Sequence, residues 1–92
     1  MNKKRNKLEM IRDMLLIVQK ARKIRITPLI YKANLSSNSI KPYINDLLKK
    51  GLMQETIIEE IKYFIITPKG NEFLQEFSKI KIFAESYGLQ EV

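Results

Sequence analysis

The fold is decided by a stretch of the chain between residues 27 and 50, which reads TPLIYKANLSSNSIKPYINDLLKK. Its first two residues, Thr27 and Pro28, predict the start of a short helix, because a hydroxyl side chain caps a helix and proline fits its first position. The segment from Asn34 to Ser37 predicts a tight turn, since asparagine tolerates a positive φ and serine caps the next helix. We therefore expect a short first helix that ends in a turn near Asn34.

A second helix comes after this turn, with one apolar and one polar side. We expect it to begin between Ser37 and Ser39, and Pro42 is harmless in the first turn of a helix that begins at Ser39. Gly51 should end the helix, because glycine readily adopts the left-handed cap conformation. The apolar residues recur at the spacing of one helix face; they are Ile40, Tyr43, Ile44, Leu47 and Leu48. Two short helices across a tight turn are typical of a helix-turn-helix.

The segment before this motif predicts one helix and one short strand. Asn6 and Glu9 form a start that resembles a capping box, and the helix is expected from about Lys7 to Lys20. Two adjoining apolar stripes make its buried face broad, so it should pack against the core or against a partner chain. Residues 24–26 alternate Ile-Arg-Ile, as a short strand does.

The segment after the motif changes to residues that favour strands. Residues 52–58 and 61–66 are both rich in β-branched and aromatic side chains, which predicts a β-hairpin. Glu59 and Glu60 lie between them and lack the Asn-Gly preference of a two-residue turn, so a longer loop is expected. A hairpin directly after a helix-turn-helix predicts the wing of a winged-helix fold.

A last helix is expected from about Pro68 to Tyr87, capped by Thr67 and ended by Gly88. Its apolar residues step by four and three positions, as along the interface of a coiled coil. Two interpretations are open: the helix packs on its own core, or it pairs with a second copy of the chain. The four aromatic side chains of this segment exceed what so small a body buries, which favours a homodimer. The residues expected in the dimer interface are Phe73, Phe77, Ile80, Phe83, Ala84 and Tyr87.

The composition narrows the possible chemistry. The 92 residues predict one domain, spanning residues 1–92. The chain has no Cys and no His, which removes disulfides, thiolate metal sites, the commonest general base and the commonest metal ligand. We therefore expect no enzyme activity, no metal site and no cofactor, and no small-molecule ligand is indicated. The apolar run from Met14 to Val18 is too short for a secretory signal or a membrane span, which favours a cytoplasmic protein without a membrane partner.

The net charge of +7 is concentrated at the start of the chain. Residues 1–34 hold ten Lys and Arg against two acidic residues, a balance of +8, whereas residues 35–92 hold seven against eight. Such a basic cluster favours a polyanionic partner, with nucleic acid ahead of a membrane surface. The plainer alternative is that the lysines only solubilise the surface.

Several segments, taken in order, resemble a known family. They are residues 31–36 (YKANLS), Tyr43 with Leu47, residues 50–52 (KGL), Tyr63 with Ile65, and residues 67–74 (TPKGNEFL). Together they resemble the small archaeal winged-helix DNA-binding proteins. The resemblance implies an α+β fold, a winged helix-turn-helix with a three-helix core and a β-hairpin wing in residues 6–67, followed by a C-terminal dimerisation helix in residues 68–88.

The same resemblance implies how such a protein works. The last helix would pair with its copy as an antiparallel coiled coil, and the second helix of the motif would read DNA. Two features depart from the family pattern. The last helix is short, which favours a compact helix packing over a true coiled coil, and the wing tip at Glu59 and Glu60 is acidic, which argues against a phosphate contact there.

The predicted function is that of a dimeric protein that binds double-stranded DNA as a transcriptional regulator. Contacts to the DNA backbone are expected from Lys3, Lys4, Arg5, Lys20, Arg22, Lys23 and Arg25. Contacts to base edges are expected from Ser37, Asn38, Ser39, Lys41 and Asn45. Two alternatives stay open: a protein–protein adaptor without DNA binding, which the acidic wing favours, and an architectural DNA-binding protein without sequence preference.

Overall fold

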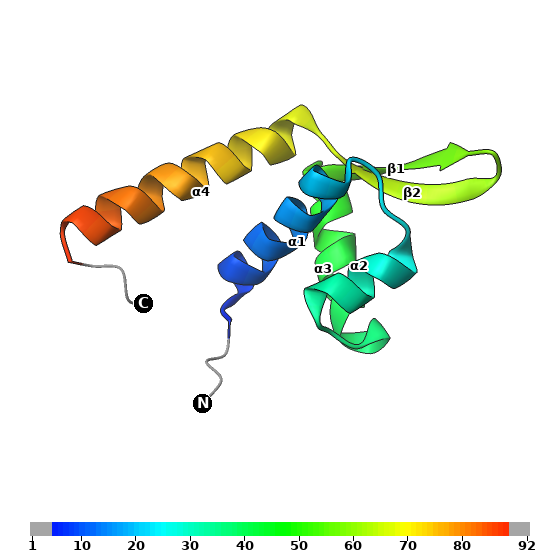
Figure 1. The fold of residues 1–92 in the computed structure, drawn as a ribbon, viewed down its shortest axis with the longest axis horizontal. Coiled ribbons are helices and arrows are strands. Elements are labelled where there is room, and N and C mark those ends of the chain that lie inside the picture. Colours follow the sequence, from blue (N-terminus) through cyan, green and yellow to red (C-terminus); the bar gives the residue numbers. More distant parts are fainter. Residues whose placement is uncertain (1–4, 89–92) are drawn as a thin grey trace.

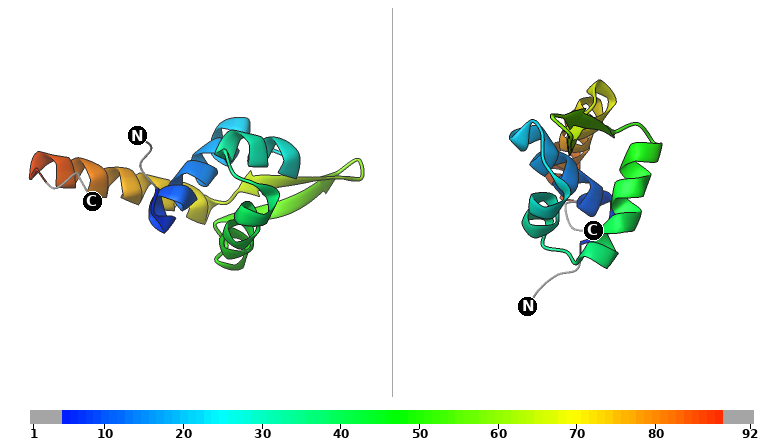
Figure 2. Two further views of the ribbon diagram at one scale, coloured as in Figure 1. Left: turned by 90° about the horizontal axis from the view of Figure 1, so that it is seen from below. Right: turned by 90° about the vertical axis from the view of Figure 1, so that its right-hand side faces the viewer.

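The computed structural model describes residues 5–88, which form four helices and a two-stranded sheet (Figure 1). In chain order the elements are α1 (Lys7–Ala21), α2 (Ile26–Ala33), α3 (Ser37–Lys49), β1 (Met53–Ile58), β2 (Ile61–Ile66) and α4 (Pro68–Ser86). The hairpin projects from the first three helices to one side, and α4 extends to the other (Figures 1 and 2). The predicted α+β fold, with a three-helix core and a wing, is confirmed.

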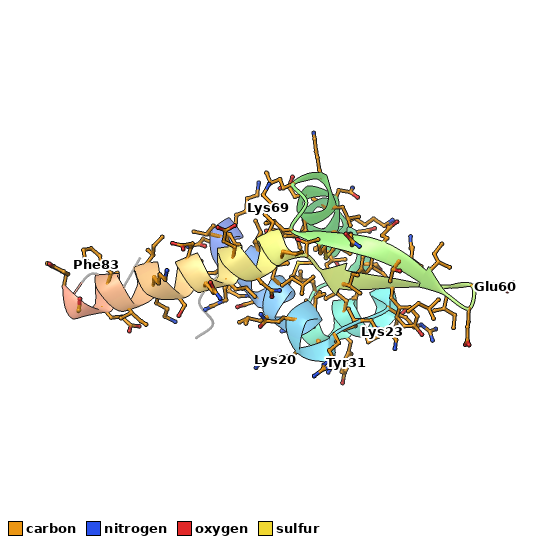
Figure 3. All side chains as sticks on the ribbon, turned by 90° about the horizontal axis from the view of Figure 1, so that it is seen from above. Lys20, Lys23, Tyr31, Glu60, Lys69 and Phe83 are labelled. Carbon is orange, nitrogen blue, oxygen red and sulfur yellow. The ribbon has the colours of Figure 1, made fainter. Side chains whose placement is uncertain are left out.

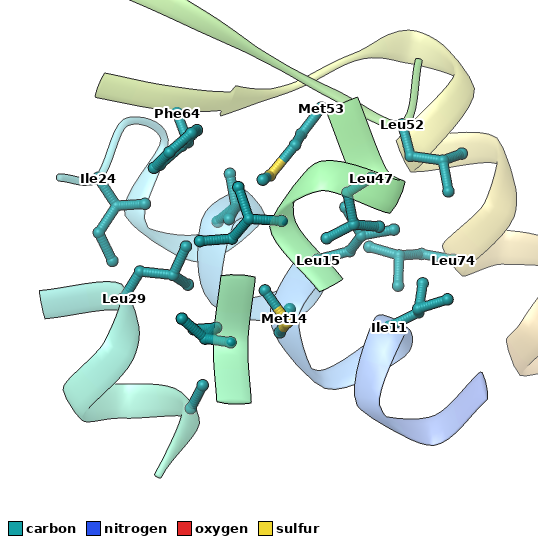
Figure 4. Packing of buried hydrophobic residues seen from close by; sticks show 14 residues of the cluster. Ile11, Met14, Leu15, Ile24, Leu29, Leu47, Leu52, Met53, Phe64 and Leu74 are labelled. Carbon is teal, nitrogen blue, oxygen red and sulfur yellow. The ribbon is translucent and has the colours of Figure 1, made fainter. Parts of the chain in front are cut away.

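The core lies where α1 meets α2, α3 and the hairpin (Figure 4). At its centre Met14, Leu15 and Val18 of α1 have no exposed surface. The other elements surround them with Leu29, Ile40, Leu47, Met53 and Phe64, all of which are buried. Each enclosed side chain of this size contributes about 1.5–3 kcal/mol. The other elements of the core therefore pack against the broad apolar face of α1.

The two ends of α1 are set by local hydrogen bonds. The side chain of Asn6 accepts a bond from the Glu9 amide at 2.8 Å, and the Glu9 carboxylate accepts one from the Asn6 amide at 3.1 Å, which confirms the capping box. At the other end Arg22 has a φ of 71° and donates to carbonyls of the last turn. The strand expected at residues 24–26 is reduced to one bridge, in which Ile24 and Phe64 exchange bonds of 3.0 and 2.7 Å.

The prediction that Thr27 caps the next helix is wrong. α2 begins at Ile26, and its N-cap is Arg25, which makes no side-chain cap bond. The bridge described above holds the preceding residue, and the Leu29 amide already reaches the Arg25 carbonyl at 3.2 Å. Pro28 becomes the third helical residue, where its missing N–H still costs nothing, because the first four amides of a helix have no partner within it.

The turn between α2 and α3 forms as the sequence predicts. Asn34 lies in the left-handed region with a φ of 60°, and its amide bonds back to the last turn of α2. Ser36 is the N-cap of α3, and its hydroxyl oxygen accepts a bond from the Ser39 amide at 3.1 Å. These few residues therefore fix the direction of α3 relative to α2.

The position of Pro42 within α3 follows from where the helix begins. α3 begins at Ser37, within the predicted interval, so Pro42 is the sixth helical residue and not part of the first turn. Its missing N–H leaves the carbonyl of Asn38 without the usual helical donor. A proline inside a helix costs about 3 kcal/mol, which the apolar burial of this helix offsets.

The segments just before and just after the hairpin, at Gly51 and at Thr67 to Gly70, are in contact with each other. Gly51 ends α3 with a φ of 73°, as predicted, and its carbonyl accepts a bond of 2.6 Å from the hydroxyl of Thr67. The Thr67 hydroxyl oxygen accepts the Gly70 amide at 3.0 Å. A Cβ at Gly70 would collide with the carbonyl oxygen of Leu52 and lie 2.7 Å from a side-chain carbon of Ile66. Glycine thus allows α4 to start against the end of α3, and this contact sets its direction.

The wing has a shorter turn than expected. β1 and β2 pair antiparallel from Met53 opposite Ile66 to Ile58 opposite Ile61, so Glu59 and Glu60 alone form the loop. Their φ values of 51° and 67° are those of a two-residue hairpin turn. The left-handed region costs residues with a Cβ roughly 1–2 kcal/mol each. Strand pairing imposes this turn against the preference of its residues.

Only the first half of α4 packs on the rest of the domain. Thr67 is its N-cap, and the helix ends at Ser86, one residue before the expected end. Leu74 is buried and Phe73 and Phe77 are half-buried, whereas the later residues extend away from the core (Figure 1). Within residues 5–88, no helix combines the length and the apolar character that crossing a membrane requires.

Candidate nucleic-acid interface

The outward side of α3 carries all five of the predicted base-reading residues. Ser37, Asn38, Ser39, Lys41 and Asn45 are exposed, while Ile40, Ile44 and Leu47 on the opposite side are buried. Ser39 has a local role, because its hydroxyl accepts a bond of 2.9 Å from the hydroxyl of the N-cap. The other four present amide, hydroxyl and ammonium groups to solvent.

Further lysines lie on the same side of the domain as α3. Lys49 and Lys50 are exposed at its end, and the ammonium group of Lys69 donates to the Lys50 carbonyl at 2.9 Å. Figure 3 shows Lys69 beside α3. Sequence reasoning did not include these residues among the DNA contacts, although Lys49 belongs to the polar side of the same helix. Their position in the sequence, just after the polar residues of α3, could have identified Lys49 and Lys50 as candidates.

One carboxylate lies among these cations. Asp46 of α3 forms salt bridges to Lys7 at 3.0 Å and to Lys50 at 3.6 Å. The hydrogen bond from Lys7, followed by the charge of Lys50, lowers the pKa of Asp46 below its usual value of 3.8. The carboxylate is ionised at neutral pH, and the two lysines offset its repulsion of a phosphate. Among residues 5–88, no three His, Cys, Asp or Glu side chains gather closely enough to hold a metal.

Four basic residues at the end of α1 and between α1 and α2, which we call the basic connection, face elsewhere. They are Lys20, Arg22, Lys23 and Arg25, all exposed, and none forms a salt bridge with a described residue. The ammonium of Lys23 lies 5.4 Å from the ring centre of Tyr63. Figure 3 shows Lys20 and Lys23 on the opposite side of the domain from α3. These residues were expected to contact the DNA backbone, but the hairpin and α2 separate them from α3.

The N-terminal arm is described only from Arg5 onward, so Lys3 and Lys4 lie outside the described residues. The guanidinium of Arg5 donates to the Asp13 carboxylate at 2.8 Å and to the Ala33 carbonyl at 3.0 Å. This residue therefore ties α1 to the end of α2. Sequence reasoning could not find this contact, because its partners are eight and twenty-eight residues away.

The wing carries little that suits a phosphate backbone. Lys62, the one basic residue of the hairpin, pairs with Glu55 at 3.3 Å. Glu59 and Glu60 are exposed at the turn. The wing is consequently acidic at the point where it extends farthest from the core.

The second half of α4 presents an uncovered apolar stripe. Ile80, Phe83 and Tyr87 are 67%, 61% and 67% exposed, and the rings of Phe83 and Tyr87 lie 4.8 Å apart. Ala84 lies half-buried in the same stripe. The other two predicted interface residues, Phe73 and Phe77, already pack on the chain itself, and the guanidinium of Arg12 covers the Phe77 ring at 5.0 Å. The structure thus divides the six residues into an inner pair and an outer group.

Comparison with known proteins settles the family. The winged helix-turn-helix family model matches residues 4–85. The chain belongs to the winged helix-turn-helix family. A search of the curated proteins finds no match. Among solved structures, this winged helix resembles Sso10a-2, a DNA-binding protein from Sulfolobus solfataricus, with a TM-score of 0.74 and 27% identity over 95% of this chain and 90% of that one.

Two more distant structures share the fold of this winged helix. A MarR-family transcriptional regulator from Silicibacter pomeroyi has a TM-score of 0.67 and 15% identity, over 92% of this chain and 58% of that one. F93 from STIV, a winged-helix DNA-binding protein, has a TM-score of 0.65 and 15% identity, over 84% of this chain and 90% of that one. The predicted resemblance to small archaeal winged-helix proteins is confirmed. In this winged helix, α2 and α3 are the helix-turn-helix and the hairpin is the wing.

Proposed function

We propose that this winged helix is a cytoplasmic homodimer that binds double-stranded DNA through the exposed side of α3 and regulates transcription. One observation carries the proposal: α3 packs its apolar side on the core and leaves a row of amide and ammonium groups exposed. Any one of these residues is ordinary on a solvated helix. Their alignment on the second helix of a helix-turn-helix, within a basic protein, is what favours DNA.

Base reading is assigned to Asn38, Lys41 and Asn45. The major groove admits an α-helix, and each base pair presents a distinct pattern of donors and acceptors there. An asparagine amide pairs with the N6 and N7 atoms of adenine, and a lysine reaches the O6 and N7 acceptors of guanine. Ser37 lies at the helix start, where free backbone amides and the helix dipole favour a phosphate.

Phosphate contacts are assigned first to the lysines on the α3 side of the domain. Lys41, Lys49, Lys50 and Lys69 are exposed there, and each phosphate that they neutralise releases counterions, so affinity should fall as salt rises. The sequence prediction placed this clamp on the basic connection. A duplex lying along α3 is separated from Lys20 and Lys23 by the body of the domain (Figure 3).

Dimerisation is assigned to the outer half of α4. A second copy would cover Ile80, Phe83 and Tyr87 with the same residues of its own helix, in an isologous contact. A groove between α1 and α4, lined in part by Leu16, Leu74 and Phe77, offers a partner helix further apolar surface nearer the core. The shortness of α4 favours compact packing of two helices over a long coiled coil.

The test is a DNA titration across salt concentrations with random and selected duplexes. Asn45→Ala should reduce the discrimination between a preferred and a random site by roughly 1–3 kcal/mol if its amide contacts a base pair, and should leave non-specific affinity nearly unchanged, because the net charge stays the same. Gln75→Ala removes an exposed amide from α4 and is the matched control. Absence of binding to any duplex at low salt would refute the proposal.

A second function is favoured by one observation, the acidic wing. A protein–protein adaptor would show no shift of DNA at low salt and would keep a protein partner at high salt. Equal affinity for all duplexes would instead identify an architectural DNA-binding protein. The titration therefore separates the three functions.

A further inference from the structure

The end of the hairpin combines apolar and acidic side chains in an unusual way for a wing. We call this surface the wing tip; it consists of Ile57, Ile58, Glu59, Glu60 and Ile61. The three isoleucines are 71%, 43% and 37% exposed. Ile58 and Ile61 form a cross-strand pair on one face of the hairpin, whereas Ile57 lies on the other face opposite Lys62, so the tip is apolar on one face and mixed on the other. The two carboxylates would be repelled by phosphate, and the exposed isoleucines are unfavourable in contact with water.

The backbone of the wing tip suggests that its charges are functional. Glu59 and Glu60 both have a positive φ, and glycine or asparagine would relax the turn. Arg22, in the basic connection, has the same feature with a φ of 71°. Residues held in such conformations gather at binding sites. Here the strained positions carry charges of opposite sign at two separate places on the surface.

The basic connection is complementary to the wing tip. Its four cations are exposed and form no salt bridge with a described residue. Tyr31 of α2 is 85% exposed and lies on the same side as Lys20 and Lys23 (Figure 3). The surface therefore offers cations for two carboxylates and an aromatic ring for the isoleucines. α3 lies on the other side, so a duplex bound to α3 leaves this surface free.

We propose that the wing tip of one molecule docks on the basic connection of a second copy of the chain. The tip cannot reach the connection of its own chain, because Glu60 lies at the far end of the hairpin from the helices (Figure 3). The contact joins two different surfaces, so it is heterologous and each molecule can use both. It is distinct from the α4 dimer and needs no DNA. Dimers would thereby associate side by side into larger assemblies.

The contact is tested by sedimentation velocity without DNA, over a range of protein and salt concentrations. The unmutated protein should form species larger than a dimer at low salt, and these should dissociate as salt screens the exposed charges. Glu59→Lys with Glu60→Lys should weaken this association by at least about tenfold, because like charges then face each other. Lys20→Glu with Arg22→Glu should do the same. A mixture of the two variants should restore association, since the altered tip matches the altered connection.

Two controls separate docking from unfolding and from general charge effects. Glu59→Asn with Glu60→Gly removes the charges but suits the turn, so it should weaken association while raising the unfolding temperature. Lys41→Glu with Lys49→Glu makes the same charge change on the α3 side and should leave association intact. The proposal is overturned if the unmutated protein stays a dimer at low salt, if the mixture does not reassociate, or if the α3-side variant dissociates equally. Association that appears only with DNA would also overturn it, and would assign the basic connection to a second duplex instead.

Discussion

Replacing Phe83 with glutamate should convert the dimer to a monomer. Phe83 is 61% exposed on the outer half of α4, so roughly 100 Å² of its apolar surface is available to a partner. Covering this area is worth about 2.5 kcal/mol at about 25 cal/mol per Å². An isologous contact uses the residue twice, which gives about 5 kcal/mol and corresponds to roughly three to four orders of magnitude in the dimer dissociation constant. A carboxylate buried at the same place would oppose the contact further.

The structure makes Phe83 a better site for this test than Phe77. Phe77 is half-buried beneath Arg12, so Phe77→Glu, which the sequence alone would suggest, also disturbs the fold of one chain. Ile82 is the matched control, because it is 64% exposed but lies roughly 100° around the helix from Phe83 and roughly 140° from Tyr87. Ile82→Glu should leave the dimer intact.

Sedimentation equilibrium at micromolar concentration, under salt that suppresses larger species, measures both variants. Circular dichroism should show that each keeps its helix content. The reasoning fails if the unmutated protein is a monomer under these conditions, or if the two variants have the same effect. In the second case the stripe of Ile80, Phe83 and Tyr87 would not be the interface.

Three further predictions concern charge and packing. Lys41→Gln with Lys49→Gln should reduce the slope of log K against log salt in DNA binding by about 0.9 for each phosphate that is no longer neutralised, and neutralising the basic connection should change it less; an opposite order in a salt titration would place the clamp on the connection. Gly70→Ala should lower the unfolding free energy by about 2 kcal/mol or more and the midpoint of thermal unfolding by roughly 10 °C, because the added carbon collides with the Leu52 carbonyl. A Cβ at Gly51 meets open space, so Gly51→Ala should cost less in the same thermal melt. The pKa of Asp46 is lowered in the folded chain, so its stabilising effect is present above pH 3.8 and disappears as the pH falls through the lowered value; Asp46→Asn should therefore be less stable at neutral pH and converge with the unmutated protein in acid denaturation.

Much of the fold comes from contacts between residues close in the chain. The capping box of Asn6 and Glu9, the left-handed turn at Asn34 and the glycine stop at Gly51 all involve partners nearby in the sequence. The period of apolar residues likewise predicted which side of α3 is buried. Local hydrogen bonding and helix geometry depend on residue order alone, so the sequence by itself determined the element order, the polar face of α3 and the family.

The tertiary structure alone decided the features that depend on distant partners. The bridge to Phe64 moved the start of α2, and strand pairing forced Glu59 and Glu60 into a strained two-residue turn. The distribution of charges along the sequence also does not show which side of the folded domain each charge faces. The sequence assigned the basic connection to the same DNA as α3, whereas the packing of α1 and α2 turns Lys20 and Lys23 to the opposite side. The order of residues fixes which charges exist, and only the packing of helices fixes which of them can face one partner together.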